Sequence, residues 1–318
     1  MDSLRTNNFT KHFLLGNNII GPSGAKAIAS FIKDYPDRIE TWYLAGNCID
    51  ATGFSLLVDS IVKSETITNV WLKRNPLETA SAKDVYGLIS RTPHLRTLDL
   101  DQTELGDVGV AEVFSSLTTA NKPVKLRYIY LNATGIGENA CKQISQYLAS
   151  PHCELHSLYM SNNPVGDAGA AALAEGLVSN LSLKRISLQS CGLKDVSVLV
   201  KAITASGTIE TLDLGQSYAT EDLGMRYNYL TEEGVTALVS LVKDSTTIKY
   251  LNLSYTPILQ AQLNKISEAA TTSTSLLWFD AKPLVKGGKD VASVKAGQES
   301  VRLWKLLRQR LQDNVKAQ

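Results

Sequence analysis

The sequence has no long hydrophobic run and very little cysteine. No stretch approaches the ~18 uninterrupted apolar residues of a membrane-spanning helix, and the opening MDSLRTNNFTKHF contains no apolar core of a secretion signal. The four cysteines, at positions 48, 141, 153 and 191, show no CxxC spacing, so we expect reduced thiols without a disulfide or zinc framework. These absences predict a cytoplasmic protein.

Net charge is also small, at +1, but it is unevenly distributed. Residues 282–318 contain nine Lys/Arg and three Asp/Glu, a local +6, which leaves 23 basic and 28 acidic residues, or −5, for the rest. A hydrophobic fraction of 44% is typical of a soluble protein with a large buried core. Any attraction to acidic surfaces is therefore expected only at the C-terminal end.

One motif, LxxLxLxxNxL, recurs along the chain. It begins at residues 10, 39, 67, 95, 126, 155, 183, 209, 248 and 276, so the steps are 26 to 31 residues except for one of 39. Its fourth and sixth residues, such as Trp42 and Leu44, alternate with positions expected to be exposed and predict a short strand with one buried face. Phe54, Leu57 and Ile61 then follow a helical spacing. The pattern predicts parallel strands that alternate with helices.

This repeat resembles the leucine-rich repeats, and in particular the 28–29-residue class of ribonuclease inhibitor and the Ran GTPase-activating proteins. Good copies are IETWYLAGNCI (39–49) and LRTLDLDQTEL (95–105). The resemblance implies an α/β solenoid, an open horseshoe with about ten parallel strands on the concave face and helices on the convex face. It does not specify a function, because the same repeat serves inhibitors, receptors, GTPase regulators and scaffolds.

The ninth motif position is expected to hold the turn that follows each strand. An asparagine there can hydrogen-bond backbone groups that the turn leaves unpaired. Four copies have this asparagine, at positions 18, 47, 75 and 163. Other copies have a small residue, namely Thr103, Thr134, Cys191, Ser217 or Thr256.

The two ends and the eighth repeat depart from the pattern. We assign residues 1–284 to the solenoid, with an 11-residue insertion near 218–228 that is either a tolerated surface loop or a contact loop. Residues 285–318 are predicted to form a basic linker and a C-terminal capping helix, whose apolar stripe is Val301, Trp304, Leu307 and Leu311. Only residues 1–8 precede the first repeat, so its apolar edge is either partly exposed or covered by a partner.

No constellation of catalytic residues is present in the sequence. The four histidines fit no metal-binding spacing, no serine lies in a GxSxG turn, and Gly135-Ile136-Gly137 belongs to the repeat framework. Asp99 and Asp101 alternate on a strand, so both should reach its outer face about 7 Å apart. That spacing would allow acid–base chemistry, but we expect contact with a partner instead. We predict no enzyme activity, no cofactor and no metal.

The outward positions of the strands suggest a binding surface. Large aromatics occupy the fifth position in repeats two to six, at Tyr43, Trp71, Tyr130 and Tyr159, interrupted by Asp99. Their expected neighbours are Lys73, Arg74, Asp101 and Tyr128. Exposed Trp and Tyr near Arg dominate binding energy at many interfaces, although strands also favour aromatics for their own stability.

We expect Trp71 and Tyr130 to be the anchors of this surface. They are two strands apart, which puts their side chains about 10 Å from each other. Asp99 should be exposed between them and should attract an Arg or Lys of the partner.

The predicted function is a non-enzymatic module that binds another protein or peptide on its concave face. We expect neither a small-molecule substrate nor nucleic acid or a membrane as the main partner. Two alternatives remain open. The chain could activate a small GTPase, although the Ran activators end in an acidic tail and this chain ends in a basic one. It could also attach to an acidic surface through its basic C-terminal helix.

Overall fold

The computed structural model describes residues 1–282 and 288–317 of the chain. The chain divides into two compact units, unit 1 at Met1–Tyr159 and unit 2 at Met160–Gln318. Residues 283–287, which include the start of the linker predicted within 285–318, lie outside the described residues. Every strand begins two residues after a predicted motif start, at each of the ten starts.

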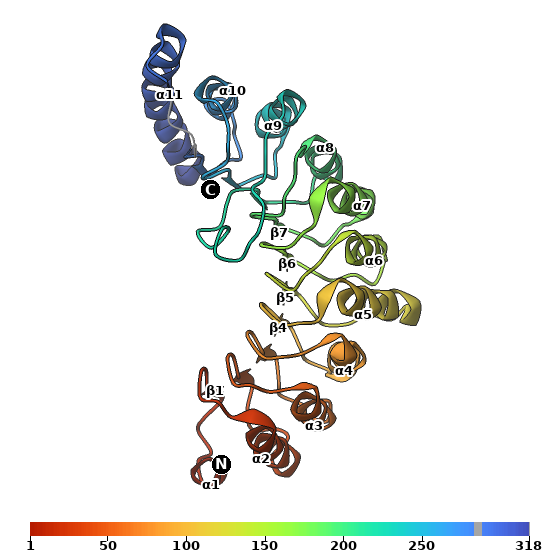
Figure 1. The fold of residues 1–318 in the computed structure, drawn as a ribbon. Coiled ribbons are helices and arrows are strands. Elements are labelled where there is room, and N and C mark those ends of the chain that lie inside the picture. Colours follow the sequence, from red (N-terminus) through yellow and green to blue (C-terminus); the bar gives the residue numbers. More distant parts are fainter. Residues whose placement is uncertain (283–287, 318) are drawn as a thin grey trace. The chain divides into compact units, whose positions relative to one another are not determined.

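Unit 1 contains six parallel strands that pair in sequence order. The strands are β1 (His12–Leu14), β2 (Thr41–Tyr43), β3 (Asn69–Trp71), β4 (Thr97–Asp99), β5 (Tyr128–Tyr130) and β6 (Ser157–Tyr159). The helices are α1 (Asp2–Arg5), α2 (Gly21–Asp34), α3 (Ala51–Ile61), the 3₁₀ turn η1 (Thr79–Ser81), α4 (Ala82–Arg91), α5 (Gly106–Ala120) and α6 (Glu138–Leu148). Helices α2 to α6 cover one face of the sheet (Figure 1).

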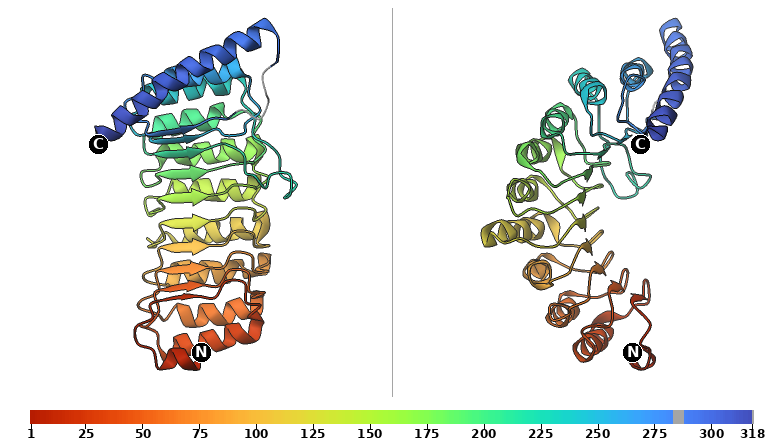
Figure 2. Two further views of the ribbon diagram at one scale, coloured as in Figure 1. Left: turned by 90° about the vertical axis from the view of Figure 1, so that its left-hand side faces the viewer. Right: turned by 180° about the vertical axis from the view of Figure 1, so that it is seen from behind.

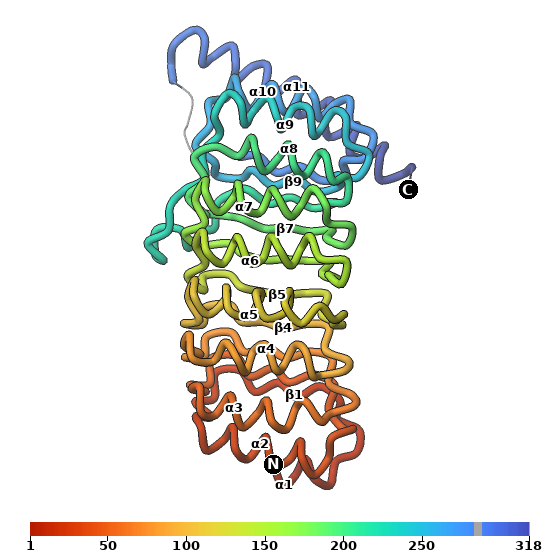
Figure 3. The backbone as a smooth tube through the Cα atoms, turned by 90° about the vertical axis from the view of Figure 1, so that its right-hand side faces the viewer, coloured from red at the N-terminus to blue at the C-terminus, as the bar shows by residue number. Residues whose placement is uncertain are grey.

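Unit 2 repeats the arrangement with four parallel strands. These are β7 (Arg185–Ser187), β8 (Thr211–Asp213), β9 (Tyr250–Asn252) and β10 (Trp278–Asp280). The helices are α7 (Gly166–Ser179), α8 (Ser197–Ser206), α9 (Glu232–Asp244), α10 (Gln260–Ala270) and α11 (Val291–Lys316). Figure 3 shows the helices in front of the strands, and the left view of Figure 2 shows the opposite face. The predicted α/β solenoid is confirmed.

The core lies between the strands and the helices of each repeat. The side chains of Trp42, Leu44, Phe54 and Leu57 are all 0% exposed, as their motif positions predict. Gly53 allows adjacent helices to pack closely, because a Cβ atom there would lie 3.2 Å from the Cβ of Ala25 and from the Cα of Pro22. Burial of the fourth and sixth residues leaves the third, fifth and seventh on the outer face of the sheet.

An asparagine side chain stabilises the turn after several of the strands. The Asn75 amide donates to the carbonyls of Leu44 (2.9 Å) and Leu72 (2.8 Å), and its Oδ1 accepts from the backbone N–H groups of Asn47 and Ile49. At Thr103, which replaces the asparagine in its repeat, the hydroxyl donates to Leu100 O of the same repeat at 2.8 Å. We call an asparagine at the ninth motif position a turn asparagine, and another residue at that position its substitute.

The insertion in the eighth repeat displaces the turn asparagine. Ser217 was predicted to hold this turn, and that prediction is wrong, because Asn228 makes the full set of four bonds. Its amide donates to Leu188 O (2.7 Å) and Leu214 O (3.0 Å), and its Oδ1 accepts from the N–H groups at positions 191 and 193. The inserted residues therefore precede Asn228.

The N-terminal edge of the chain by itself is partly exposed. Leu4 of α1 is buried, and the Arg38 guanidinium donates to the carbonyls of Leu4 and Arg5. Phe9 and Leu14 remain 93% and 68% exposed.

We predict that Asn75→Leu lowers the free energy of unfolding by at least ~2 kcal/mol, because each buried group left unpaired costs about 1–3 kcal/mol. Urea unfolding followed by circular dichroism measures the change. Asn139→Leu, at an exposed position of α6, is the control. Equal stabilities of the two variants would contradict the role given to Asn75.

A second pair of variants tests the displaced register. Asn228→Leu should destabilise the protein as much as Asn75→Leu, whereas Ser217→Ala should change the free energy of unfolding by less than about 0.5 kcal/mol. The same urea titrations compare them. If Ser217→Ala lowered the free energy of unfolding more than Asn228→Leu does, Ser217 and not Asn228 would be the residue that stabilises this turn.

Candidate functional site

Four aromatic side chains on the outer face of the unit 1 sheet form one continuous row, which we call the aromatic ladder. Tyr43 on β2, Trp71 on β3, Tyr130 on β5 and Tyr159 on β6 are its members. Their ring centroids are 5.9, 5.4 and 4.3 Å apart in that order, and the last pair is stacked with an interplanar angle of 4°. All four rings are half-buried. The sequence therefore places the aromatics correctly on one surface.

Trp71 and Tyr130 are closer together than predicted. They flank Asp99 in the strand register, so their backbones are two strands apart, about 10 Å. The 5.4 Å between their rings corrects the expected side-chain separation of about 10 Å. The short Asp99 side chain leaves space above it, and the two large rings fill this space by leaning together.

Asp99 is consequently not accessible to a partner. It was predicted to lie exposed between the anchors, but it is only 3% exposed. Its Oδ1 accepts a hydrogen bond from the backbone N–H of Asp101, 2.9 Å away. The prediction that Asp99 attracts an Arg or Lys of the partner is therefore wrong, because rings and backbone enclose the carboxylate.

Asp101 is also buried, at 7% exposure, and it stabilises the turn after β4. It accepts hydrogen bonds from the backbone N–H and the side-chain amide of Asn132, at 2.7 and 3.0 Å. The Lys73 ammonium lies 3.8 Å from Asp101 Oδ2. Sequence reasoning missed Asn132, although its place on the repeat that follows Asp101 could have indicated the contact.

Burial changes the ionisation of both acids. It raises the pKa of Asp99 to about 7, and the negative charge of Asp101 adds to this effect, while the Asp101 N–H and Lys73 oppose it. Burial likewise raises the pKa of Asp101, against the opposing bonds from Asn132 and the charge of Lys73. Two adjacent carboxylates with one partly exposed cation are thus held beneath the aromatic ladder.

The remaining predicted site residues surround the ladder. Tyr128, the first residue of β5 and the third of its repeat motif, is 39% exposed, and its ring meets His156 edge-on at 6.3 Å. Arg74 is exposed and lies in the turn after β3, where its φ of +56° places it in the left-handed region. His156 was not among the predicted site residues, because only the fifth motif position was followed along the stack.

The repeats match those of known proteins. The model of the family "Leucine Rich repeat" matches residues 92–114 and 152–174. The chain is 32% identical over 219 residues to human "NACHT, LRR and PYD domains-containing protein 12", covering 68% of this chain and 19% of that protein. It is 24% identical over 279 residues to pig ribonuclease inhibitor, covering 87% of this chain and 52% of the inhibitor. The chain thus spans about half of the inhibitor's length and much less of the human protein's.

This chain is a leucine-rich-repeat protein of the ribonuclease-inhibitor type.

A solved structure supports the same fold. The leucine-rich repeat-containing protein LegL7 from Legionella pneumophila superposes with a TM-score of 0.53 at 16% identity, covering 93% of this chain and 92% of that one. At this identity the likeness shows the fold alone. Leucine-rich-repeat membership indicates a binding module rather than an enzyme.

The unit 2 sheet of this leucine-rich-repeat protein carries aromatics at the third motif position. Arg185, Tyr250 and Trp278 line a hollow of about 490 Å³ together with Thr211, Asp213 and Asn252. Burial raises the pKa of Asp213 to about 6. The third position, followed along the stack as the fifth was, would have indicated these side chains from the sequence.

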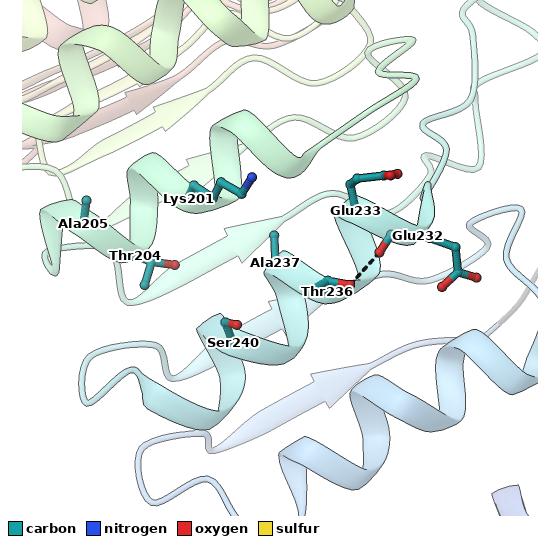
Figure 4. Close-up of a pocket in the computed structure, with 8 residues that line it drawn as sticks. All are labelled: Lys201, Thr204, Ala205, Glu232, Glu233, Thr236, Ala237 and Ser240. Carbon is teal, nitrogen blue, oxygen red and sulfur yellow. Dashed lines mark hydrogen bonds between the residues drawn. The ribbon is translucent and has the colours of Figure 1, made fainter.

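A separate hollow of about 480 Å³ lies between α8 and α9 (Figure 4). The small side chains of Ala205 and Ala237 leave this space between the helices. At its rim the Glu232 carboxylate is engaged by α10, accepting from Lys265 Nζ at 3.0 Å. Among residues 1–282 and 288–317, no group of three or more His, Cys, Asp or Glu could hold a metal ion, and no helix could span a membrane.

We predict that Asp99→Asn stabilises the protein relative to wild type at pH 8. The folded pKa of about 7 exceeds the ordinary value of 3.8, so the contribution of Asp99 to wild-type stability is greatest below pH 4 and is lost as the pH rises through 7. The gain from Asn should therefore grow by about 2–4 kcal/mol between pH 4.5 and pH 8.

Urea titrations at both pH values measure this gain. Glu104→Gln, at an exposed position, controls for the loss of one negative charge. An Asp99→Asn gain that is independent of pH, or a loss at pH 8, would contradict the burial of the charged carboxylate.

Proposed function

We propose that the chain is a non-enzymatic interaction module and that unit 1 binds a protein partner across its aromatic ladder. The observation that carries the proposal is the ladder itself, four rings in mutual contact on the outer face of the sheet. Leucine-rich-repeat proteins are protein-interaction modules, and the name of one relative, ribonuclease inhibitor, describes action on another protein. These likenesses support binding in general, while the position of the site rests on the ladder.

The ladder suits a partner because it is fixed before binding. Mutual stacking restricts the rings, so less side-chain freedom is lost when a partner covers them. Trp and Tyr side chains supply large contact areas. Those that become buried at the centre of an interface usually contribute most of its binding energy. We expect a partner loop or helix that runs across β3 to β5 and presents apolar side chains to Trp71 and Tyr130.

The charge of the expected partner follows from the burial of Asp99. Because Asp99 and Asp101 are covered, they do not attract cations from solution directly. Arg74 is exposed at the end of β3 and can pair with an acid. The complementary surface is therefore apolar, with an acidic residue near Arg74.

We predict that Trp71→Ala and Tyr130→Ala each weaken partner binding by about 2 kcal/mol or more, which is roughly a 30-fold increase in Kd. The two substitutions should be coupled, because the rings touch. Folding should persist, since both side chains lie outside the core. Thermal unfolding checks folding, and calorimetric titration with the recovered partner measures Kd.

The partner is obtained by affinity capture with wild type, Trp71→Ala and Tyr130→Ala in parallel. Tyr250→Ala is the matched control, an aromatic of the unit 2 sheet that is 40% exposed. The proposal would be contradicted if Trp71→Ala and Tyr130→Ala left the partner's affinity unchanged while deletion of residues 217–227 lowered it. Binding would then be assigned to the inserted loop.

A further inference from the structure

Helix α11 has one face that packs against the solenoid. Leu303 and Leu307 are 2% and 0% exposed. The Asn314 amide donates to Ser273 O (3.0 Å) and Leu276 O (2.8 Å), in the segment that connects α10 to β10. This seam closes the end of unit 2, and Figure 2 shows α11 beside α10.

The apolar stripe predicted for this helix is largely a different face. Val301 was expected to be buried but is 60% exposed, while Trp304 and Leu311 are only half-buried. Of the four predicted residues, only Leu307 lies in the packed seam. The other three point to one side of it, at helical spacings that continue to Val315. A cap needs a single buried face, so this second apolar face is not explained by capping.

The second face of α11 and the last strand enclose a groove of about 1110 Å³. One wall is Leu277, Trp278 and Phe279 at β10. The other wall is formed by the apolar Val301, Trp304, Leu311 and Val315 with Lys305, Arg308, Gln312 and Lys316. Trp304 stacks on Phe279 at 5.9 Å, and the Trp278 side chain is 43% exposed.

The strand that forms one wall has an outer edge without a strand neighbour among the described residues. In the preceding repeat, Lys249 O accepts from Leu277 N and Trp278 N, and Leu253 N donates to Asp280 O. The equivalent groups of the last repeat are Leu277 O and Ala281 N. Such an edge can add one more extended segment through main-chain hydrogen bonds.

The charge of the groove is one-sided. Among the described residues that line it, three are cationic and none is acidic. Lys305, Arg308 and Lys316 form no ion pair within the described part of the chain, whereas the neighbouring Arg302 is paired with Glu299. Cations without an intramolecular partner beside apolar side chains complement a segment that is both acidic and apolar.

We propose that the groove between β10 and α11 binds an extended, acidic segment of a partner protein, which adds to the edge of β10. The segment places apolar side chains against Trp278, Trp304 and Leu311, and its carboxylates meet Lys305 and Arg308. The face of α11 from Val301 to Lys316 is about 22 Å long. About seven residues of extended chain span this length at ~3.3 Å each.

A peptide suits this site better than a membrane surface. A helix that binds a membrane presents its apolar face outward as a continuous surface. Here the apolar side chains face β10 across a groove, where a single extended chain fits between helix and strand.

The test uses the full chain and a defined probe, a fluorescein-labelled octapeptide of alternating valine and glutamate. Fluorescence anisotropy should show at least tenfold tighter binding of this peptide than of its valine–lysine counterpart. Lys305→Glu/Arg308→Glu should reverse the preference. Lys289→Glu/Lys295→Glu makes the same change in net charge at exposed positions outside the groove and should preserve the preference. N-methylation of alternate residues in the peptide should weaken binding at least tenfold, because it blocks strand addition.

Three results would overturn the proposal. The first is equal binding of the two peptides, or no binding of either. The second is an equal effect of the two double variants. The third is binding to phosphatidylserine vesicles that Lys305→Glu/Arg308→Glu abolishes, without any peptide preference, which would assign the surface to a membrane. Circular dichroism of each double variant confirms that it is folded.

Discussion

Hydrogen bonding in the turn after each strand is the constraint on which the rest of the structure depends. A solenoid of short strands leaves backbone N–H and C=O groups unpaired wherever the chain leaves the sheet, and these groups are buried between repeats. A single asparagine side chain satisfies four of them across two neighbouring repeats, as Asn75 and Asn228 do. Together with the pairing of adjacent parallel strands, such bonds fix the register, and the register brings the outward side chains of the sheet together. The aromatic ladder follows from it.

Most of the fold could be predicted because its signals are local and repeated. All ten motif starts match strands, since burial of the fourth and sixth residues requires a fixed periodicity. The turn at Asn228 could not be placed by counting from the start of its strand, because an insertion separates the two. Counting back from Leu230 would have placed it correctly. The packed face of α11 was misassigned because apolar residues occur on two of its faces, and only contacts with α10 distinguish them.

The sequence predicted which residues form the candidate site, but not how deeply each of them is buried. Strand alternation shows that Trp71, Asp99 and Tyr130 point outward, and pairing shows that they are neighbours. It does not show that two large rings lean over a small side chain between them. Whether the two rings lean together depends on side-chain volume and on the favourable energy of aromatic contact. It converts Asp99 from an exposed acid into a buried one with a raised pKa, and so changes the expected partner from cationic to apolar.

The most direct test of the account is whether a partner touches Trp71 in solution. The chain has four tryptophans, so 5-fluorotryptophan labelling gives four ¹⁹F resonances, which single Trp→Phe variants assign. On titration with the captured partner, the account predicts that the Trp71 resonance shifts. The resonance of the fully buried Trp42 should stay in place, as should those of Trp278 and Trp304 in the groove of unit 2. A saturating partner that leaves the Trp71 resonance unchanged would contradict binding at the aromatic ladder.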